Sequence, residues 1–377
     1  MTQPKRKKRR LRGPKRRFFP VAEPVLGEAE ARGVAECVRS GWISSLSPWV
    51  RKFEEGFAAY CGVKDAVAVS SGTAGLHLVL VALGVGPGDE VIVPDMTFVA
   101  TANAVAYTGA RVVTADVDPE TWNITPETVR RVLTGRTRVV IPVHLFGNPA
   151  DVAGIRRVIG PGVAVIEDAA ESHGAVFRGR KTGALGTVGV FSFYANKIIT
   201  TGEGGMITCR SRRLGKRLRF LRDHSMDPKR RYYHPEIGFN YRLTGIQAAL
   251  GIAQMRRIEE ILLAKRGIAE WYREFLGEER GLKFQRERAG AKSSQWMVSV
   301  LLPKGVKRTR IERRLRERGI DTRPFFHPIS SLPMYSGSRK QPVAKELFRR
   351  GITLPSGANL GREDVRWICC TLRECLS

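Results

Sequence analysis

A lysine between an apolar run and a glycine-rich loop is the first candidate for chemistry. Lys197 follows the run 191–193 and precedes the loop 202–205. Burial at such a position would depress the pKa of the amine, and the glycines would let a bulky group approach the backbone. Lys197 is therefore a candidate Schiff-base lysine, although a solvated lysine at a strand end is the commoner explanation of any single lysine.

Two further segments supply the groups that such a lysine needs for cofactor chemistry. Asp168 follows an apolar run, so it should end a buried strand, where open α/β sheets collect their ligand sites. The segment 70–74 is typical of a strand end, a small-residue turn and a helix N-terminus, whose free amides and dipole favour a phosphate. Pyridoxal phosphate needs an acid for its ring nitrogen and a lysine for its aldehyde. The three features together predict a pyridoxal phosphate site.

The elements that must position these groups follow a βαβ pattern. From Lys64 to Val190, short β-branched runs alternate with helical stretches, one of them over 126–133. This alternation predicts an α/β fold of the doubly wound kind. The predicted strands are 66–70, 90–94, 111–115, 138–142, 164–167 and 188–193.

A change of pattern after Asn240 predicts a second domain. Residues 244–263 carry apolar side chains at helical spacing, which is typical of a long amphipathic helix. A strand over 296–302 and helices over 309–318 and 363–372 then predict a smaller α+β domain. The expected division is a basic arm over 1–17, a large domain over 18–265 and a small domain over 266–377.

The charge balance is strongly basic, with 64 Lys and Arg against 36 Asp and Glu in 377 residues. Ten of these cations lie between Lys5 and Arg17 with no acid among them, which predicts a self-repelling, disordered arm. A solvated tail or a wrongly assigned start codon explains such an arm at least as well as a nucleic-acid contact does.

Composition excludes several other classes. With 42% hydrophobic residues the chain is an ordinary globular protein, and no apolar run approaches the roughly 18 residues that a membrane helix requires. No apolar run of an export signal follows Arg17. The six cysteines show neither zinc-type pairs nor a disulfide framework, so we expect no metal site and a reducing, cytoplasmic location.

The chain resembles the DegT/DnrJ/StrS family of sugar-nucleotide aminotransferases from about Pro20 to the C-terminus. The resemblance implies a fold-type I pyridoxal phosphate transferase, with a large domain built on a mixed, mostly parallel sheet flanked by helices and a smaller α+β C-terminal domain. The matching blocks are 41–45, 70–74, 94–101, 167–172, the Lys197 segment and 238–242.

The resemblance assigns roles to individual residues. It makes Lys197 the Schiff-base lysine and proton shuttle, and Asp168 the partner of the pyridine nitrogen. Asn240 would reach the cofactor phosphate of a neighbouring subunit, which implies a homodimer. The cofactor contacts implied are the turn residues Gly72, Thr73 and Ala74, the stacking ring of Phe98, and the side chains of Glu171 and Ser192.

The same resemblance suggests where substrates bind. Relatives that dehydrate sugars replace the lysine with histidine, so Lys197 favours amino transfer. Arg242 would bind either a nucleotide phosphate or the carboxylate of the amino donor. A structural role explains His173 and His327 equally well. The candidate substrate residues are Ser44, His173, Arg242 and His327.

The implied function is transfer of the amino group of glutamate, through pyridoxal phosphate, to a keto group of a nucleotide-linked deoxysugar. The favoured acceptor is a GDP-linked 4-keto-6-deoxymannose, and the product would enter surface polysaccharide, such as O-antigen, or a glycosylated metabolite. A UDP- or dTDP-linked 3- or 4-ketohexose is the alternative. A regulatory or nucleic-acid-binding protein that reuses the fold is a third hypothesis, which only the basic arm supports.

Overall fold

The computed structural model describes residues 18–277, 281–335 and 341–377. The basic arm predicted over 1–17 lies outside the described residues. Within these ranges, the helices are all too short or too polar to cross a bilayer.

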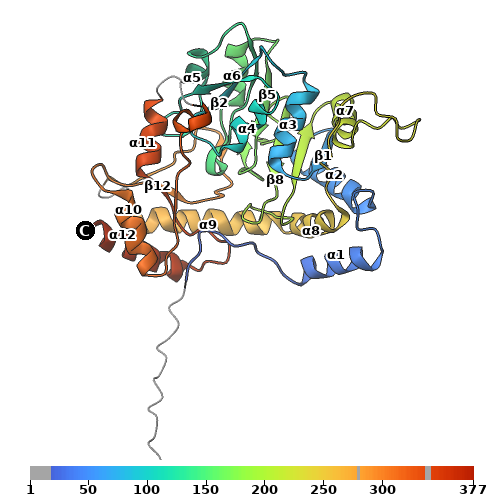
Figure 1. Cartoon of the computed structure of the whole chain (residues 1–377). Coiled ribbons are helices and arrows are strands. Elements are labelled where there is room, and N and C mark those ends of the chain that lie inside the picture. The colour runs from blue at the N-terminus through green and yellow to red at the C-terminus, as the bar shows by residue number, and fades with distance from the viewer. Residues whose placement is uncertain (1–17, 278–280, 336–340) are drawn as a thin grey trace, which may run out of the picture.

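A seven-stranded sheet forms the centre of the large domain (Figure 1), in the order β1-β9-β8-β5-β4-β2-β3. β9 runs antiparallel to both of its neighbours, and the other strands are parallel to one another. The mixed, mostly parallel sheet predicted from the sequence is therefore confirmed. Its strands are β1 (Asp65–Val69), β2 (Glu90–Pro94), β3 (Arg111–Ala115), β4 (Thr137–Val140), β5 (Ala164–Asp168), β8 (Val188–Ser192) and β9 (Gly205–Cys209).

The sheet separates two apolar cores because successive side chains of a strand point to opposite faces. In β1, Val67 and Val69 join one core, whereas Ala66 and Ala68 join the other. Helices from both sides of the sheet complete these cores, as parallel strands require. They are α2 (Pro48–Cys61), α3 (Gly72–Ala82), α4 (Ala100–Ala106), α5 (Pro126–Arg130), α6 (Val152–Ile159) and α7 (Arg212–Arg222).

The single helix expected over 244–263 is wrong, because the structure has two helices there. α8 (Gly245–Arg256) ends at Arg257, whose ψ of 3° leaves the helical range, and α9 (Ile258–Leu276) follows directly. The two helices follow one another across the lower part of the molecule in Figure 1, and α1 (Glu28–Arg39) lies beside α8.

The second half of α9 belongs to a separate, smaller core. Leu262 packs in the core of the large domain, whereas Ile268 and Tyr272 pack in the core of the C-terminal part. The expected boundary at 265 falls where α9 changes cores, and the domain division itself stays a prediction. The small part contains a second sheet in the order β10-β12-β14-β13. Its strands are β10 (Lys283–Phe284), β12 (Ser299–Leu301), β13 (Arg323–Pro324) and β14 (Gly351–Thr353), and its helices are α10 (Arg308–Glu317), α11 (Pro342–Arg350) and α12 (Arg362–Leu376).

Candidate active site

The N-terminus of α3 forms one wall of a cavity at the carboxyl ends of the strands. The Ser71 hydroxyl caps the helix by accepting from the Ala74 amide at 3.1 Å, and the first turn carries no acidic side chain. A Cβ on Gly72 would lie 3.1 Å from that of Ser192, so the glycine lets α3 approach the end of β8. Gly72, Thr73 and Ser192 all line the cavity, whereas the Ala74 amide is occupied by the cap.

Asp168 is the last residue of β5 and is buried beneath the same cavity. Its Oδ2 accepts from Thr101 Oγ1 at 2.8 Å and its Oδ1 from the Ala170 amide at 3.2 Å. Burial raises the pKa of Asp168, while these hydrogen bonds and the charge of Lys197 oppose the increase. Thr97 Oγ1 lies 2.9 Å from Thr101 Oγ1, and because Thr101 donates to Asp168, Thr97 donates to Thr101.

Lys197 projects into the cavity from the loop after β8. Its Nζ lies 3.9 Å from the centroid of the Trp296 ring, and Trp296 Nε1 donates to the carbonyl of Asn196 at 2.7 Å. The residue as a whole is half-buried, and its amine lies against the Trp296 ring. Burial lowers the pKa of Lys197, whereas the nearby charges of Glu171 and Asp168 act to raise it. Because the effect of burial is larger, the amine loses a proton more readily than a solvated lysine does.

Glu171 adds a second buried carboxyl to the cavity wall. Its Oε2 accepts from the Phe146 amide at 2.7 Å. Burial raises the pKa of Glu171 to about 7, with the Lys197 charge acting in the opposite direction. Glu171 can therefore carry a proton at neutral pH.

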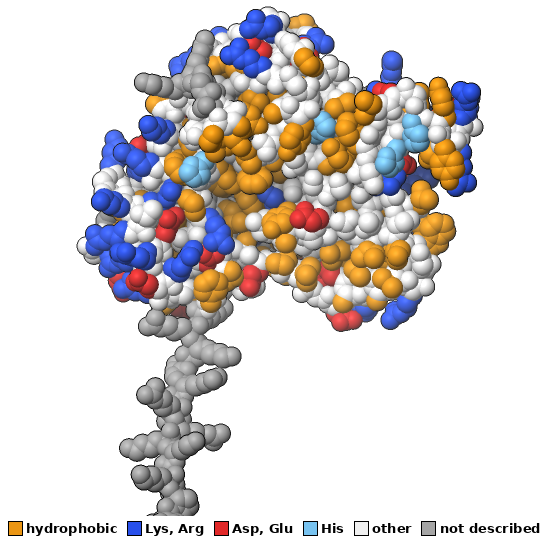
Figure 2. All heavy atoms as spheres, in the orientation of Figure 1, with side chains coloured by type: hydrophobic (Ala, Val, Ile, Leu, Met, Phe, Trp, Pro, Cys, Tyr) orange, Lys and Arg blue, Asp and Glu red, His pale blue; other side chains and the backbone are white. Residues whose placement is uncertain are grey.

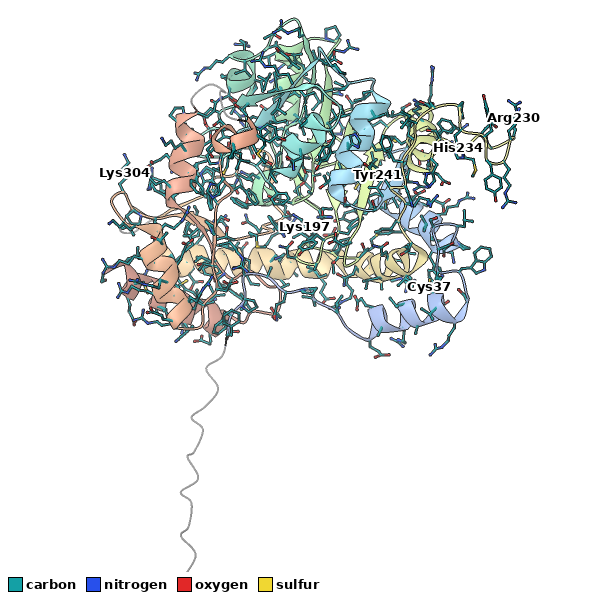
Figure 3. All side chains as sticks on the ribbon, viewed as in Figure 1. Cys37, Lys197, Arg230, His234, Tyr241 and Lys304 are labelled. Atoms are coloured by element: carbon teal, nitrogen blue, oxygen red, sulfur yellow. The ribbon has the colours of Figure 1, made fainter. Side chains whose placement is uncertain are left out.

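These groups enclose a cavity of about 330 Å³, which suits a small-molecule ligand. Figure 3 shows Lys197 at the centre of the molecule, between the sheet and α9. The predicted residues that line the cavity are Gly72, Thr73, Phe98, Asp168, Glu171, Ser192 and Lys197.

His173 lies beside this cavity but is not part of its wall. It is fully buried among the rings of Phe57, Phe191 and Phe193. That burial lowers the pKa of His173 to about 3, so the ring is neutral. The structure favours a structural role for His173 over the expected contact with the sugar.

The remaining predicted residues also lie outside the cavity. Ser44 and Asn240 are exposed at the surface. Arg242 forms an ion pair with Asp223. His327 packs its ring against Phe348, with 4.2 Å between ring centroids, and lines an adjoining outer cavity. Their roles as substrate or cofactor contacts stay predictions.

Sequence reasoning missed two residues that touch the reactive groups. Thr101 lies in the block 94–101 that matches the family and in the first turn of α4, whereas Thr97 precedes that helix, so no regular spacing marks the pair of hydroxyls in the sequence. Trp296 lies about a hundred residues from Lys197 along the chain, and no local pattern connects them.

The residues around the cavity fit pyridoxal phosphate. Its ring nitrogen needs a carboxylate, its aldehyde a lysine and its phosphate an anion site. Asp168, Lys197 and the start of α3 supply these three groups on the wall of one cavity. Hydrogen bonds from Thr101 and the Ala170 amide favour the charged form of Asp168, which is the form that pairs with a protonated ring nitrogen.

Known proteins share this architecture over nearly the whole chain. The model of the DegT/DnrJ/EryC1/StrS aminotransferase family matches residues 24–373. The GDP-perosamine synthase of Caulobacter vibrioides is 43% identical over 363 residues, which cover 94% of this chain and 98% of that protein. EpsN of Bacillus subtilis, provisionally named a pyridoxal phosphate-dependent aminotransferase, is 40% identical over 357 residues, covering 91% and 92%.

A solved structure agrees with these relatives. The aminotransferase TlmJ from Streptoalloteichus hindustanus superposes with a TM-score of 0.91 at 36% identity, over 95% of this chain and 99% of that one. The likeness therefore extends over both domains expected from the sequence.

Proposed function

The chain belongs to the DegT/DnrJ/EryC1/StrS aminotransferase family, and from this premise we propose that it transfers the amino group of glutamate to a keto group of a nucleotide-linked deoxysugar. It is a pyridoxal phosphate-dependent sugar aminotransferase. The observation that carries the proposal is the single cavity lined by Lys197, Asp168 and the N-terminus of α3.

The proposed acceptor is GDP-4-keto-6-deoxymannose, which would be converted to GDP-perosamine. Relatives named GDP-perosamine synthase, from Caulobacter vibrioides and Escherichia coli O157:H7, support this choice at 43% and 39% identity. A UDP- or dTDP-linked ketohexose is the alternative acceptor. We propose that the product supplies surface polysaccharide synthesis in the cytoplasm.

Lys197 and Asp168 have the central tasks in this reaction. The cofactor, when bound, supplies an electron sink that stabilises negative charge at the carbon bearing the transferred nitrogen. Lys197 Nζ, neutral more readily because of its burial, takes the proton from Cα of glutamate and returns a proton during amination of the sugar. The hydrogen bond from Thr101 stabilises the carboxylate form of Asp168, which would pair with the protonated ring nitrogen of the cofactor.

The surroundings of Lys197 orient it and exclude water. The indole of Trp296 holds the carbonyl of Asn196 through a hydrogen bond and lies against the amine of Lys197, so one side chain positions both the backbone before the lysine and its Nζ. The buried rings of Phe191 and Phe193 lie on either side of Ser192 in the strand end before the lysine. Restricting the amine in this way reduces the entropic cost of reaching the reactive geometry.

The proposed active unit is a homodimer in which Asn240 approaches the partner's cofactor. Tyr241, the neighbour of Asn240 in the chain, lies where a segment projects from the body of the molecule, with Arg230 at the outer end of that segment and His234 closer to the body (Figure 3). Large apolar side chains near this segment and near Ser44 are exposed to solvent, which supports burial against a second copy. They include Trp42, Ile43, Leu46, Tyr232 and Ile237.

The test is the complete reaction with purified protein, pyridoxal phosphate, glutamate and GDP-4-keto-6-deoxymannose. We expect 2-oxoglutarate and a GDP-linked amino sugar to form in equal amounts by mass spectrometry. Parallel assays with UDP- and dTDP-linked ketohexoses show which nucleotide sugar the protein accepts. A folded wild-type protein that binds the cofactor but yields no 2-oxoglutarate would refute the proposal.

A lysine variant with a matched control assigns the reactive amine. Lys197→Ala should abolish both products and prevent borohydride from fixing the cofactor to the chain. Lys304→Ala removes an exposed lysine that points away from the body of the molecule (Figure 3) and should leave both signals intact. Borohydride fixation that persists in Lys197→Ala would show that another lysine holds the cofactor.

A further inference from the structure

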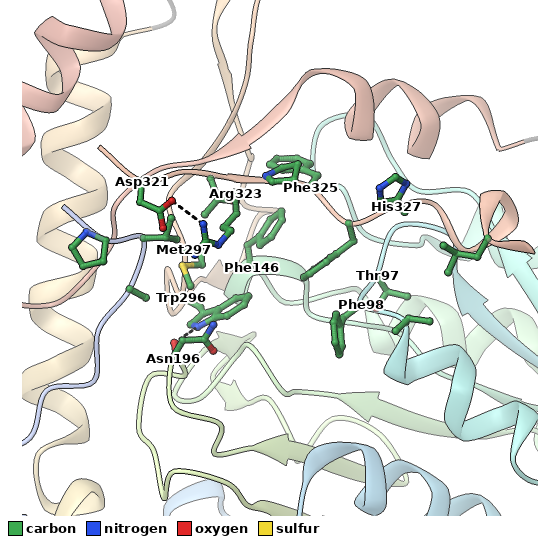
Figure 4. A pocket seen from close by; sticks show the side chains of 18 residues that line it. Thr97, Phe98, Phe146, Asn196, Trp296, Met297, Asp321, Arg323, Phe325 and His327 are labelled. Carbon is green, nitrogen blue, oxygen red and sulfur yellow. Dashed lines mark hydrogen bonds and ion pairs between the residues drawn. The ribbon is translucent and has the colours of Figure 1, made fainter. Parts of the chain in front are cut away.

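An outer cavity of about 550 Å³ adjoins the one that contains Lys197. Figure 4 shows it between the start of α4 and the segment that continues from β13 (Arg323–Pro324). Most of its lining is apolar and aromatic. The two cavities share Thr97, Phe98, Asn196, Trp296 and Phe326, so these residues form a neck through which one ligand can extend.

Arg323 gives the outer cavity its fixed positive charge. Among the described residues that line it, Arg323 is the one lysine or arginine. Its Nη1 donates to Asp321 Oδ1 at 2.8 Å, and Figure 4 shows this pair at the cavity wall. The side chain of Arg323 is nevertheless 59% exposed, so part of its guanidinium remains accessible to a ligand.

The carboxylate beside Arg323 does not cancel the local charge. Asp321 is 10% exposed in its side chain and also pairs with Arg316 Nη2 at 3.7 Å. Two arginines therefore share one carboxylate, which leaves one net positive charge. The Asp321 amide donates to the Phe19 carbonyl at 2.9 Å, so the backbone that carries this cluster is fixed.

Resting on the proposed function, we infer that the outer cavity binds the nucleoside diphosphate of the sugar substrate and that Arg323 contacts the diphosphate. The keto carbon must reach Lys197 in the inner cavity, so the rest of the substrate has to pass the neck. The diphosphate then enters a cavity whose one cationic lining side chain is Arg323. A guanidinium offers the forked donors that phosphate oxygens prefer.

This arrangement separates two anion sites. The N-terminus of α3 lies on the inner cavity, where the cofactor phosphate would bind, and Arg323 lies on the outer one. Glutamate carries no diphosphate and needs only the inner cavity. Loss of Arg323 should therefore affect the sugar half-reaction and spare the glutamate half-reaction.

The test compares Arg323→Gln with Arg310→Gln, which removes the same charge from an exposed position on α10. Figure 2 shows Lys and Arg side chains gathered over this part of the molecule. For Arg323→Gln we expect the KM for the GDP-ketosugar and the dissociation constant of GDP to rise about 10- to 150-fold, as for loss of a hydrogen bond to a charged group. Arg323→Lys should recover part of the affinity. Arg310→Gln should match the wild type.

Separate half-reactions make the outcomes distinct. The rate of 2-oxoglutarate formation from glutamate should stay within about twofold of the wild type in Arg323→Gln, because glutamate makes no diphosphate contact. Equal losses in both half-reactions, or wild-type affinity for GDP and UDP in Arg323→Gln, would overturn the inference. Absence of the glutamate half-reaction in the wild type would instead overturn the proposed function.

The basic arm is the competing source of positive charge, because the chain enters the described structure at Phe18 and Pro20 lines the outer cavity. Removal of residues 1–17 should leave the KM for the GDP-ketosugar unchanged. If this deletion weakens GDP binding and Arg323→Gln does not, the arm and not Arg323 supplies the contact.

Discussion

Replacing Thr101 with valine tests how the chain keeps Asp168 ionised. Valine keeps the shape of the side chain and removes the hydroxyl that donates to Asp168 Oδ2 at 2.8 Å. A hydrogen bond to a charged group is worth about 1.5–3 kcal/mol, which corresponds to about a 10- to 150-fold change in an equilibrium constant. The dissociation constant of pyridoxal phosphate, measured by absorbance titration at neutral pH, should rise by that factor.

The same variant should shift the pH dependence of cofactor binding. Burial raises the pKa of Asp168, and the Thr101 hydrogen bond lowers it, so its loss raises the pKa further. Because the carboxylate is the form that holds a protonated ring nitrogen, binding is lost as the pH falls through this pKa. The acid midpoint of Thr101→Val should therefore lie at a higher pH than that of the wild type.

Thr371→Val is the matched control for Thr101→Val. Thr371 is also buried, but its hydroxyl donates to the Trp367 carbonyl within α12 at 2.8 Å, far along the chain from the cavity. This variant should bind the cofactor like the wild type. If Thr101→Val keeps wild-type affinity and an unshifted acid midpoint while folding normally, the assignment of Thr101 as the support of Asp168 is wrong.

Two further variants test the buried charges. In the absence of cofactor, native Glu171 keeps a proton between pH 4.5 and about 7 that the unfolded chain has released, so this residue contributes less to the unfolding free energy as the pH rises over that range. The difference in unfolding free energy between the wild type and Glu171→Gln, measured by urea unfolding, should therefore fall from pH 4.5 to about 7. Lys265→Met should lower the unfolding free energy by about 2–5 kcal/mol, because Lys265 Nζ donates to the carbonyls of Trp296 and Ser356 in the interior. Lys307→Met, at an exposed position, should change the unfolding free energy little. Equal losses of unfolding free energy in Lys265→Met and Lys307→Met would contradict the role of Lys265.

The sequence predicted the parallel strands well because their signal is local. The strands over 90–94 and 111–115 match β2 and β3 residue for residue, since β-branched runs bounded by turn residues specify them. β9 was missed because its first residue, Gly205, belongs to the glycine-rich loop. The break at Arg257 was missed because apolar residues at helical spacing continue across it.

The sequence by itself determined which groups could do the chemistry. The sequence places Asp168 directly after the predicted strand 164–167 and Lys197 shortly after the predicted strand 188–193, and the carboxyl ends of parallel strands meet at one edge of the sheet. This rule and the turn predicted over 70–74 led to the prediction that Asp168, Lys197 and Gly72 lie at one site. No tertiary contact had to be known for that prediction.

Only the tertiary structure decided how those groups are held. The ring of Trp296 against Lys197, the hydroxyl of Thr101 on Asp168 and the burial of His173 each join segments that are far apart in the chain. Such contacts depend on how helices and loops pack on the sheet, and packing follows from the shapes of many side chains together. Local patterns of residue type carry no information about that arrangement.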